Sequence, residues 1–371
     1  MGQNQGCPVA EGRAGPGKRG DFVLIGWVMG APMRIVLCYP VEQHHVAAIR
    51  AAMPEAEVVD AGQERIAEAL FSADIFCGHA KVPVDWEGVV RQGRLRWIQS
   101  SAAGTDHCLV PAVIDSDIVV TSASGVLADQ VAEHTVALLT AWCRSLPVFF
   151  RAQQLKQFVR RPTRDLHHST VGIIGLGGVG RRLARLLSLF KTRIVATDMF
   201  PIDKPEWVES LWPPERLDDL LQLSSIVVLA APLNETTRGI INAETLARMR
   251  RGALLANMAR GPLVATDDLV QALKSGHLGG AVLDVTDPEP LPQENPLWEM
   301  PNVIITPHVG GQSARRIDNM TRLFCENLRR WQAGEPLINQ LTDKRLGFPV
   351  RGGPYPLWSD TADDTLKRSL H

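Results

Sequence analysis

Four side chains that carry charge or exchange a proton follow apolar segments in the second half of the sequence. Arg260 follows "ALLANMA", Asp284 ends "GGAVLD" with Glu289 shortly after it, and His308 follows "NVIITP". Arginine offers a charged fork of donors that matches a carboxylate, and a histidine beside a carboxylate exchanges a proton near neutral pH. Taken singly, these residues could be a surface ion-pair residue, a solvated loop acid or a capped histidine. Their shared placement favours one site for acid–base chemistry on an anionic substrate.

The segment "VGIIGLGGVGRRLARLL", which begins at Val171, has glycines spaced for a bound dinucleotide. Gly175 would permit a tight turn, Gly177 would let a pyrophosphate approach the backbone, and Gly180 would let a helix pack closely on a strand. The following apolar run "RIVATD" ends at Asp198, 18 residues beyond Gly180, near the spacing of an acid that binds a ribose 2′-hydroxyl. This pattern predicts NAD rather than NADP; the alternative is that the glycines only ease a turn from strand to helix.

The two sets of residues complement each other chemically. A nicotinamide cofactor supplies a hydride, a histidine supplies the proton that a developing alkoxide needs, and an arginine holds a carboxylate. The sequence therefore predicts NAD(H)-dependent reduction of a small 2-oxo acid.

Apolar segments alternate with amphipathic ones along most of the chain from Met33. The first series of expected strands is "RIVLCY", "AEVVD", "ADIFCG", "LRWIQS" and "DIVVTS", with helices in "EQHHVAAIRAAM" and "ERIAEALF". A long helix behind Asp129, which we expect to be its N-cap, leads to a second series that begins with "TVGIIG" and ends with "NVIITP". Alternating strands and helices predict an α/β protein with two doubly wound parallel-sheet domains.

Composition narrows the class of protein. The chain has 371 residues, of which 45% are hydrophobic and 21% charged, and a net charge of −1, as expected for a globular protein of two domains that does not bind nucleic acid. The six cysteines are scattered, with neither a CxxC pair nor a cluster at metal-ligand spacing. We therefore expect no structural metal and a reducing, cytoplasmic environment.

The first 32 residues stand apart from the alternating pattern. Arg13, Lys18 and Arg19 precede the apolar run "FVLIGWVMGA", which is typical of a short secretory signal but too short to span a membrane. Asp21 and Pro32 argue against a signal. We expect a disordered extension or an early start codon, with a targeting segment as the alternative.

The sequence resembles the D-isomer-specific 2-hydroxyacid dehydrogenase family, and in particular its glyoxylate/hydroxypyruvate reductases, from about Met33 to Asp343. The matching segments, in order, are "GVLADQVAEHTVALL", "TVGIIGLGGVGRRLA", "LLANMARGPLV", "GGAVLDVTDPEPLP" and "NVIITPHVGGQSA". The resemblance implies a flavodoxin-like substrate domain from 33–128 and 311–345, a Rossmann NAD domain from 129–310, and a C-terminal tail from 346–371. It also implies a homodimer with the long helix from Gln130 and the cofactor domain at the interface. We expect no membrane partner.

The resemblance assigns roles to individual residues. Arg260 would bind the substrate carboxylate and carbonyl, His308 would be the general acid/base, Glu289 its partner, and Asp284 would hold the nicotinamide carboxamide. Backbone N–H groups around Ala103 and Gly104, in "SSAAGTD", would receive the carboxylate, so the substrate residues are Ala103, Gly104, Arg260 and His308. The implied cofactor residues are Gly175, Gly177, Gly178, Val179, Gly180, Asp198, Pro232, Thr237, Ala259, Asp284, His308 and Gly310.

Some residues narrow the activity that we expect within the family. Formate dehydrogenases pair their histidine with glutamine, so Glu289 favours carbonyl reduction, with glyoxylate or hydroxypyruvate as substrate. His79 and Lys81 follow the third expected strand, and we interpret them as surface residues. The remaining histidines that match no catalytic position, interpreted as structural or solvated, are His44, His45, His107, His167 and His168. Ala265 replaces a commonly acidic residue, and Thr266 could cap the helix that follows it instead.

A different class of function fits the same motifs. The C-terminal-binding-protein corepressors resemble this pattern and keep a similar Arg, Glu and His, so the chain could be an NAD(H)-sensing binding protein without catalytic turnover. Assays of NADH consumption with several 2-oxo acids would separate the two hypotheses.

Overall fold

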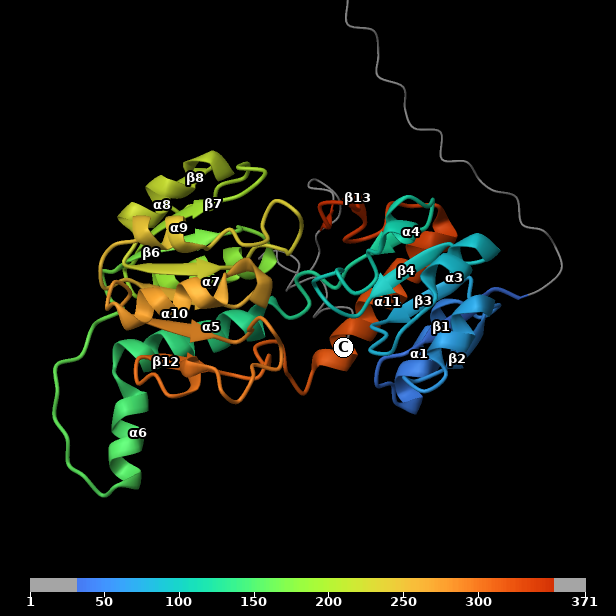
Figure 1. Ribbon diagram of the computed structural model, residues 1–371. Helices are drawn as coiled ribbons and strands as arrows, with labels where there is room; N and C mark the ends of the chain where they lie inside the picture. The colour runs from blue at the N-terminus through green and yellow to red at the C-terminus, as the bar shows by residue number, and fades with distance from the viewer. Residues whose placement is uncertain (1–31, 350–371) are drawn as a thin grey trace, which may run out of the picture. The chain divides into compact units, whose positions relative to one another are not determined.

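The computed structural model describes residues 32–349, which contain two parallel β-sheets (Figure 1). The first sheet has five strands in the order β2-β1-β3-β4-β5. Its strands are β1 (Arg34–Leu37), β2 (Glu57–Asp60), β3 (Ile75–Gly78), β4 (Trp97–Ser100) and β5 (Val119–Thr121). This is the flavodoxin-like order, in which the strand order, not the strand direction, reverses between β1 and β3.

The second sheet has seven strands in the order β12-β11-β10-β9-β6-β7-β8. Its strands are β6 (Thr170–Ile174), β7 (Arg193–Thr197), β8 (Ser210–Trp212), β9 (Ile226–Leu229), β10 (Leu254–Asn257), β11 (Gly280–Leu283) and β12 (Val303–Ile305). All neighbours pair in parallel, and the order reverses between β6 and β9. Ligands of such sheets bind beyond the carboxyl ends of the strands at this point.

Helices cover both faces of the five-stranded sheet. On one face lie α1 (Gln43–Ala52) and α11 (Arg316–Ala333), which share a core with residues of β1, β3 and β4. The other face carries α2 (Ile66–Ala69), η1 (Leu70–Ser72), α3 (Trp86–Gln92) and α4 (Pro111–Ile114). The apolar stripe of α11 buries Met320, Phe324 and Leu328 there, so the last long helix completes the first sheet's core.

A polar contact joins α1 to α11. His45 Nδ1 accepts the N–H of Glu42 at 3.0 Å, so the proton of its neutral ring lies on Nε2, 2.7 Å from Asp318 Oδ1. His44 Nε2 also lies 3.3 Å from that oxygen. A metal would need the lone pair of His45 Nε2, and this hydrogen bonding directs a proton there instead. The three side chains therefore serve as a tie between two helices.

Helices also cover both faces of the seven-stranded sheet. The helices α5 (Ala128–Cys143) and α7 (Gly178–Ser188) pack on one face. On the other face lie α8 (Leu217–Leu223), α9 (Ala243–Arg248) and α10 (Thr266–Lys274). Beyond α5 comes α6 (Leu146–Gln154), and the short turns are η2 (Pro214–Arg216), η3 (Gly261–Leu263) and η4 (Pro296–Trp298). The hairpin β13 (Leu341–Asp343) and β14 (Phe348–Pro349) follows α11.

The predicted fold class is confirmed, and two local predictions are wrong. Asp129 does not cap α5: the cap position is Leu127, and Asp129 lies in the first turn, 2.5 Å from Arg182 Nε. Thr266 is the first residue of α10 rather than its cap, because its hydroxyl donates to the carbonyl of Asp287 at 2.6 Å. In both cases the side chain makes a tertiary contact instead of capping the helix.

Predictions about residues 1–31 and 350–371 lie outside the described part of the chain, and so does Cys7. The other five cysteines are buried and unpaired with one another. Among the described residues, none of the helices is both long and apolar enough to cross a membrane.

Candidate active site

The glycine loop between β6 and α7 has the shape that a pyrophosphate requires. Gly175 has a φ of +94°, and a Cβ there would lie 2.7 Å from the backbone of Ala231. A Cβ on Gly180 would lie 2.2 Å from the Gly175 carbonyl oxygen, so this glycine brings the helix close to the strand. A Cβ on Gly177, at the N-cap of α7, would meet nothing within 4 Å. Gly177, with Gly178 and Val179 next to it, thus presents open backbone at the positive end of a helix.

Asp198 follows β7 and turns its carboxylate toward this loop. Its Oδ2 accepts the N–H of Leu176 at 2.7 Å, and its Oδ1 accepts the N–H of Phe200 at 2.9 Å. The side chain is nearly buried. A fixed negative charge therefore lies directly beside the glycine loop.

The loop after β9 is shaped by its own side chains. The Thr237 hydroxyl donates to the Pro232 carbonyl at 2.7 Å and accepts the N–H of Asn234 at 2.9 Å. Since β9 neighbours β6, this loop lies next to the glycine loop at the same edge of the sheet.

Arg260 is held in place where β10 ends. Its Nη1 donates to the Ala259 carbonyl at 2.8 Å, and its Nε lies 3.1 Å from Oδ1 of Asp106 in the loop after β4. Burial alone would raise the pKa of Asp106, but the Arg260 guanidinium and the loop backbone hold it below its usual value. A Cβ on Gly104 would lie 1.8 Å from Arg260 Nη2. The guanidinium thus lies directly against the predicted substrate loop, next to the exposed Ala103.

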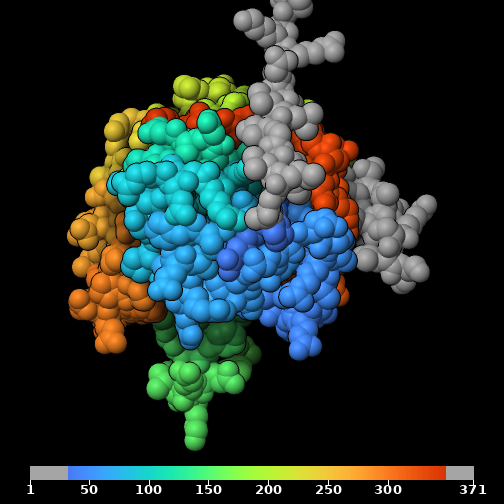
Figure 2. Space-filling model, turned by 90° about the vertical axis from the view of Figure 1, so that its right-hand side faces the viewer, coloured from blue at the N-terminus to red at the C-terminus, as the bar shows by residue number. Residues whose placement is uncertain are grey.

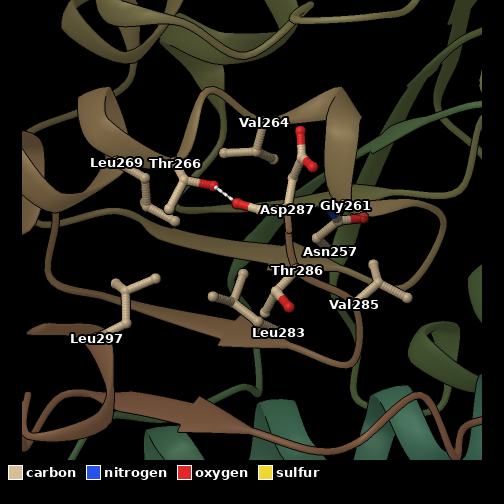
Figure 3. A pocket seen from close by; sticks show the side chains of 10 residues that line it. All are labelled: Asn257, Gly261, Val264, Thr266, Leu269, Leu283, Val285, Thr286, Asp287 and Leu297. Carbon is tan, nitrogen blue, oxygen red and sulfur yellow. Dashed lines mark hydrogen bonds between the residues drawn. The ribbon is translucent and has the colours of Figure 1, made fainter. Parts of the chain in front are cut away.

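The turn that carries Arg260 also packs on the loop that carries Glu289. The Asn257 side-chain amide holds this turn with two hydrogen bonds. It donates to the Arg260 carbonyl at 2.8 Å and accepts the N–H of Ala259 at 3.1 Å. A Cβ on Gly261 would lie only 1.8 Å from the Thr286 carbonyl oxygen. Figure 3 shows the residues that line a small cavity beside these two loops, with the Thr266–Asp287 hydrogen bond among them. Its lining is mostly apolar and lacks Arg260, Glu289 and His308.

Asp284 holds the loop that positions His308. Its carboxylate accepts the N–H groups of Val309 and Gly310 at 2.9 and 2.8 Å and the Thr306 hydroxyl at 2.7 Å. His134, on α5, lies 3.1 Å from that hydroxyl through its Nε2. This network fixes a loop in which His308 has a φ of +54°, a conformation that few side chains adopt without support.

His308 pairs with Glu289. The histidine Nδ1 lies 2.8 Å from Glu289 Oε1. An ionised carboxylate only accepts hydrogen bonds, so Nδ1 carries a proton, and Nε2 is the ring atom left for a reacting group. Both side chains are 43–46% exposed, as a site open to substrate requires.

Two histidines interpreted as structural or surface residues lie in the same region. The rings of His79 and His107 stack with centroids 3.8 Å apart and an interplanar angle of 21°. Burial lowers the pKa of His107 to about 4 and also lowers that of His79. The interpretation of His79 as a plain surface residue is thus replaced by a half-buried, stacked ring.

The structure therefore brings the predicted residues together from three neighbouring strands. Arg260 follows β10, Asp284 follows β11 and His308 follows β12, and these strands pair in that order. Asp106 and His134 were missed, because an acid in a loop and a histidine on a helix show no partner in the sequence. Asp284 binds the His308 loop in the described structure, which its predicted role toward the cofactor did not foresee.

An open glycine loop lies where the strand order of the parallel sheet reverses, and an Arg and a His–Glu pair lie at the same edge of that sheet. This combination defines an NAD(P)-binding oxidoreductase. Residues 136–310 match the model of the D-isomer specific 2-hydroxyacid dehydrogenase NAD binding domain. The chain is 36% identical over 263 residues to a glyoxylate reductase of Thermofilum pendens, covering 68% of this chain and 76% of that protein.

Two further similarities agree. A human glyoxylate reductase/hydroxypyruvate reductase is 35% identical over 258 residues, which cover 67% of this chain and 77% of that protein. A D-isomer specific 2-hydroxyacid dehydrogenase from Xanthobacter autotrophicus Py2, solved in complex with NADPH and MES, matches with a TM-score of 0.73 at 31% identity, covering 86% of this chain and all of that one. The chain belongs to the D-isomer specific 2-hydroxyacid dehydrogenase family.

Proposed function

We propose that this 2-hydroxyacid dehydrogenase reduces a small 2-oxo acid of the glyoxylate or hydroxypyruvate type to the D-2-hydroxy acid, with NADH as hydride donor. The observation that carries the proposal is the His308–Glu289 pair at the same sheet edge as Arg260. The similarity to glyoxylate and hydroxypyruvate reductases supports the substrate class. The division into a discontinuous substrate domain (33–128 and 311–345) and an NAD domain (129–310) belongs to this proposal.

Different residues of the chain carry out the different steps of the proposed reaction. When bound on the glycine loop, the nicotinamide cofactor supplies the hydride. Arg260, held by Asp106 and the Ala259 carbonyl, binds the substrate carboxylate together with backbone N–H groups near Ala103 and Gly104. His308 gives the proton on Nε2 to the carbonyl oxygen, and Glu289 stabilises the positive imidazolium from the Nδ1 side. Asp284 keeps the His308 loop in place.

NADH consumption with glyoxylate, hydroxypyruvate, pyruvate and phenylpyruvate tests the proposal directly. We expect turnover of the small substrates and formation of the D-product where the product is chiral. If none of these substrates is turned over while NADH still binds tightly, the proposed reductase activity is replaced by the NAD(H)-sensing function of the corepressor type.

The cofactor preference rests on the charge of Asp198. A carboxylate beside the ribose accepts its 2′-hydroxyl and repels a 2′-phosphate, so we propose a preference for NADH. The NADPH in the Xanthobacter relative makes the comparison informative. With Asp198→Asn, which keeps an acceptor for the Leu176 N–H but removes the charge, we expect kcat/KM with NADPH to rise about tenfold relative to NADH. A wild-type enzyme that uses both cofactors equally would contradict the assignment.

A homodimer is proposed through the long helix from Gln130, which is α5, together with the segment that follows it. Phe150, Leu155, Phe158 and Val159 expose 42–88% of their surface there, and Figure 2 shows this green segment standing out from the surface. Exposed apolar side chains this close together favour a partner, and we commit to a second copy of the chain. A cytoplasmic location remains a prediction, in keeping with buried, unpaired thiols.

The dimer can be tested by changing apolar residues of this segment. We expect Phe150→Glu with Phe158→Glu to shift the protein from dimer to monomer in sedimentation velocity, because both charges would be buried in the interface. Leu189→Glu, at an exposed apolar position beyond α7, is the matched control and leaves the dimer intact. A wild-type protein that sediments as a monomer refutes the proposal.

A further inference from the structure

His79 takes no part in the steps above, yet its backbone is firmly held. It directly follows β3, and the Gln63 amide donates to its carbonyl at 2.9 Å. The same amide group accepts the N–H of Lys81 at 2.8 Å through its oxygen. The loop after β3 is thus fixed by Gln63, which places the His79 ring at the carboxyl edge of the first sheet.

His107 forms the support on which this ring rests. Its Nε2 lies 3.5 Å from the Ser100 hydroxyl, and its ring interacts with the Gly78 backbone. The His79 ring stacks on it at 3.8 Å. Within residues 32–349, no hydrogen bond to a ring nitrogen of His79 is found. One histidine of the stack is therefore anchored, and the other retains hydrogen-bonding capacity.

His79 lies near the candidate substrate site, because it stacks on His107, the chain neighbour of the Asp106 that pairs with Arg260. Its imidazole interacts with Asp106 and Lys81, with Arg260 from the second sheet, and with Arg316 at the start of α11. Burial and the three cations lower its pKa, and Asp106 opposes them only in part. These effects favour the neutral form of the ring. A neutral imidazole has one donor and one acceptor, the same pair of functions that a hydroxyl group offers.

We propose that His79, supported by His107, is a specificity-determining residue that hydrogen-bonds a hydroxyl group on C3 of the 2-oxo acid. The inference rests on the proposed function and narrows it: the preferred substrate is a 3-hydroxy-2-oxo acid, hydroxypyruvate being the smallest. With the carboxylate on Arg260 and the carbonyl oxygen at His308, C3 is the remaining substituent of C2. Glyoxylate has only hydrogen there and pyruvate a methyl group, so neither meets the ring nitrogens.

The test compares substrates that differ only at C3. The values of kcat/KM are measured with glyoxylate, pyruvate, hydroxypyruvate and oxaloacetate for the wild type, His79→Leu, His79→Gln, His107→Ala and His167→Leu. Each variant is first titrated with NADH, and an unchanged Kd shows that the fold is intact. His167 is an exposed histidine of the second sheet's domain and serves as the matched control.

We expect the wild type to favour hydroxypyruvate over pyruvate by about tenfold or more, since an unmet polar group in the site penalises the analogue that lacks the hydroxyl. His79→Leu lowers kcat/KM for hydroxypyruvate about tenfold and leaves glyoxylate and pyruvate within about twofold. His79→Gln restores much of the preference, His107→Ala weakens it in the same selective way, and His167→Leu changes nothing.

Other outcomes overturn the inference. Equal losses with all substrates in His79→Leu would show a merely structural role, and a wild-type preference for pyruvate or oxaloacetate would show that no hydroxyl is recognised. Both results leave the proposed reductase intact. Absence of turnover with every substrate removes the proposed function and this inference together.

Discussion

Replacement of His308 by glutamine is expected to lower kcat by about 10²–10⁴-fold with every 2-oxo acid, while NADH still binds. Glutamine keeps a polar group at this position but has no proton to exchange near neutral pH. Because the Asp284 network holds the loop through its backbone and Thr306, the loop itself is expected to persist. Steady-state kinetics and NADH fluorescence titration measure the two effects separately.

Two further variants test whether the loss of activity comes from the role of His308 in proton transfer. Glu289→Gln keeps an acceptor for His308 Nδ1 but removes the charge that stabilises the imidazolium, so we expect a smaller loss than in His308→Gln. His167→Gln, at an exposed position, is expected to match the wild type. If His308→Gln retains kcat within about threefold, His308 is not the proton donor and the assignment of the site is wrong.

Replacement of Arg260 by lysine is expected to lower kcat/KM about 100-fold or more, with a raised KM for the 2-oxo acid. The guanidinium contacts Asp106 and the Ala259 carbonyl at the same time, and it needs further donors for the substrate. A lysine ammonium is a point charge without this planar fork, so it would lose the geometry while keeping the charge.

Arg248→Lys provides the control for this substitution. Arg248 also pairs with acids, Asp218 and Glu244, but at an exposed place on α9, where ion pairs contribute little. We expect its kinetics to be unchanged. An Arg260→Lys variant whose KM for the 2-oxo acid equals that of the wild type would show that Arg260 does not bind the carboxylate.

The fold and the main chemical groups could be predicted from the sequence because both are encoded locally. Apolar runs ending in turns predict the strands of a parallel sheet, and the carboxyl ends of such strands meet at one edge. Arg260, Asp284 and His308 each lie within three residues of a strand end. The spacing of Gly175, Gly177 and Gly180 is likewise a property of one short segment.

The contacts that tune the site could not be predicted, because each joins segments far apart in the chain. Asp106 and Arg260 are separated by 154 positions, and His134 and Thr306 by 172. The stack of His79 on His107 joins the loops after β3 and β4. Sequence alone gave these loop residues no partners, so His79 looked like an ordinary surface residue.

The close contact of Gly261 with the Thr286 carbonyl has a consequence for redesign. It couples the arginine turn and the acid-bearing loop so tightly that neither could be lengthened or given a bulkier residue without displacing the other. On the larger sheet, the loop that carries the proton-transfer residues and the turn that carries the anion-binding arginine would then have to change together during evolution. The loop after β3 is held instead by the side chain of Gln63, so directed evolution of substrate range should concentrate its accepted changes around residues 79–81.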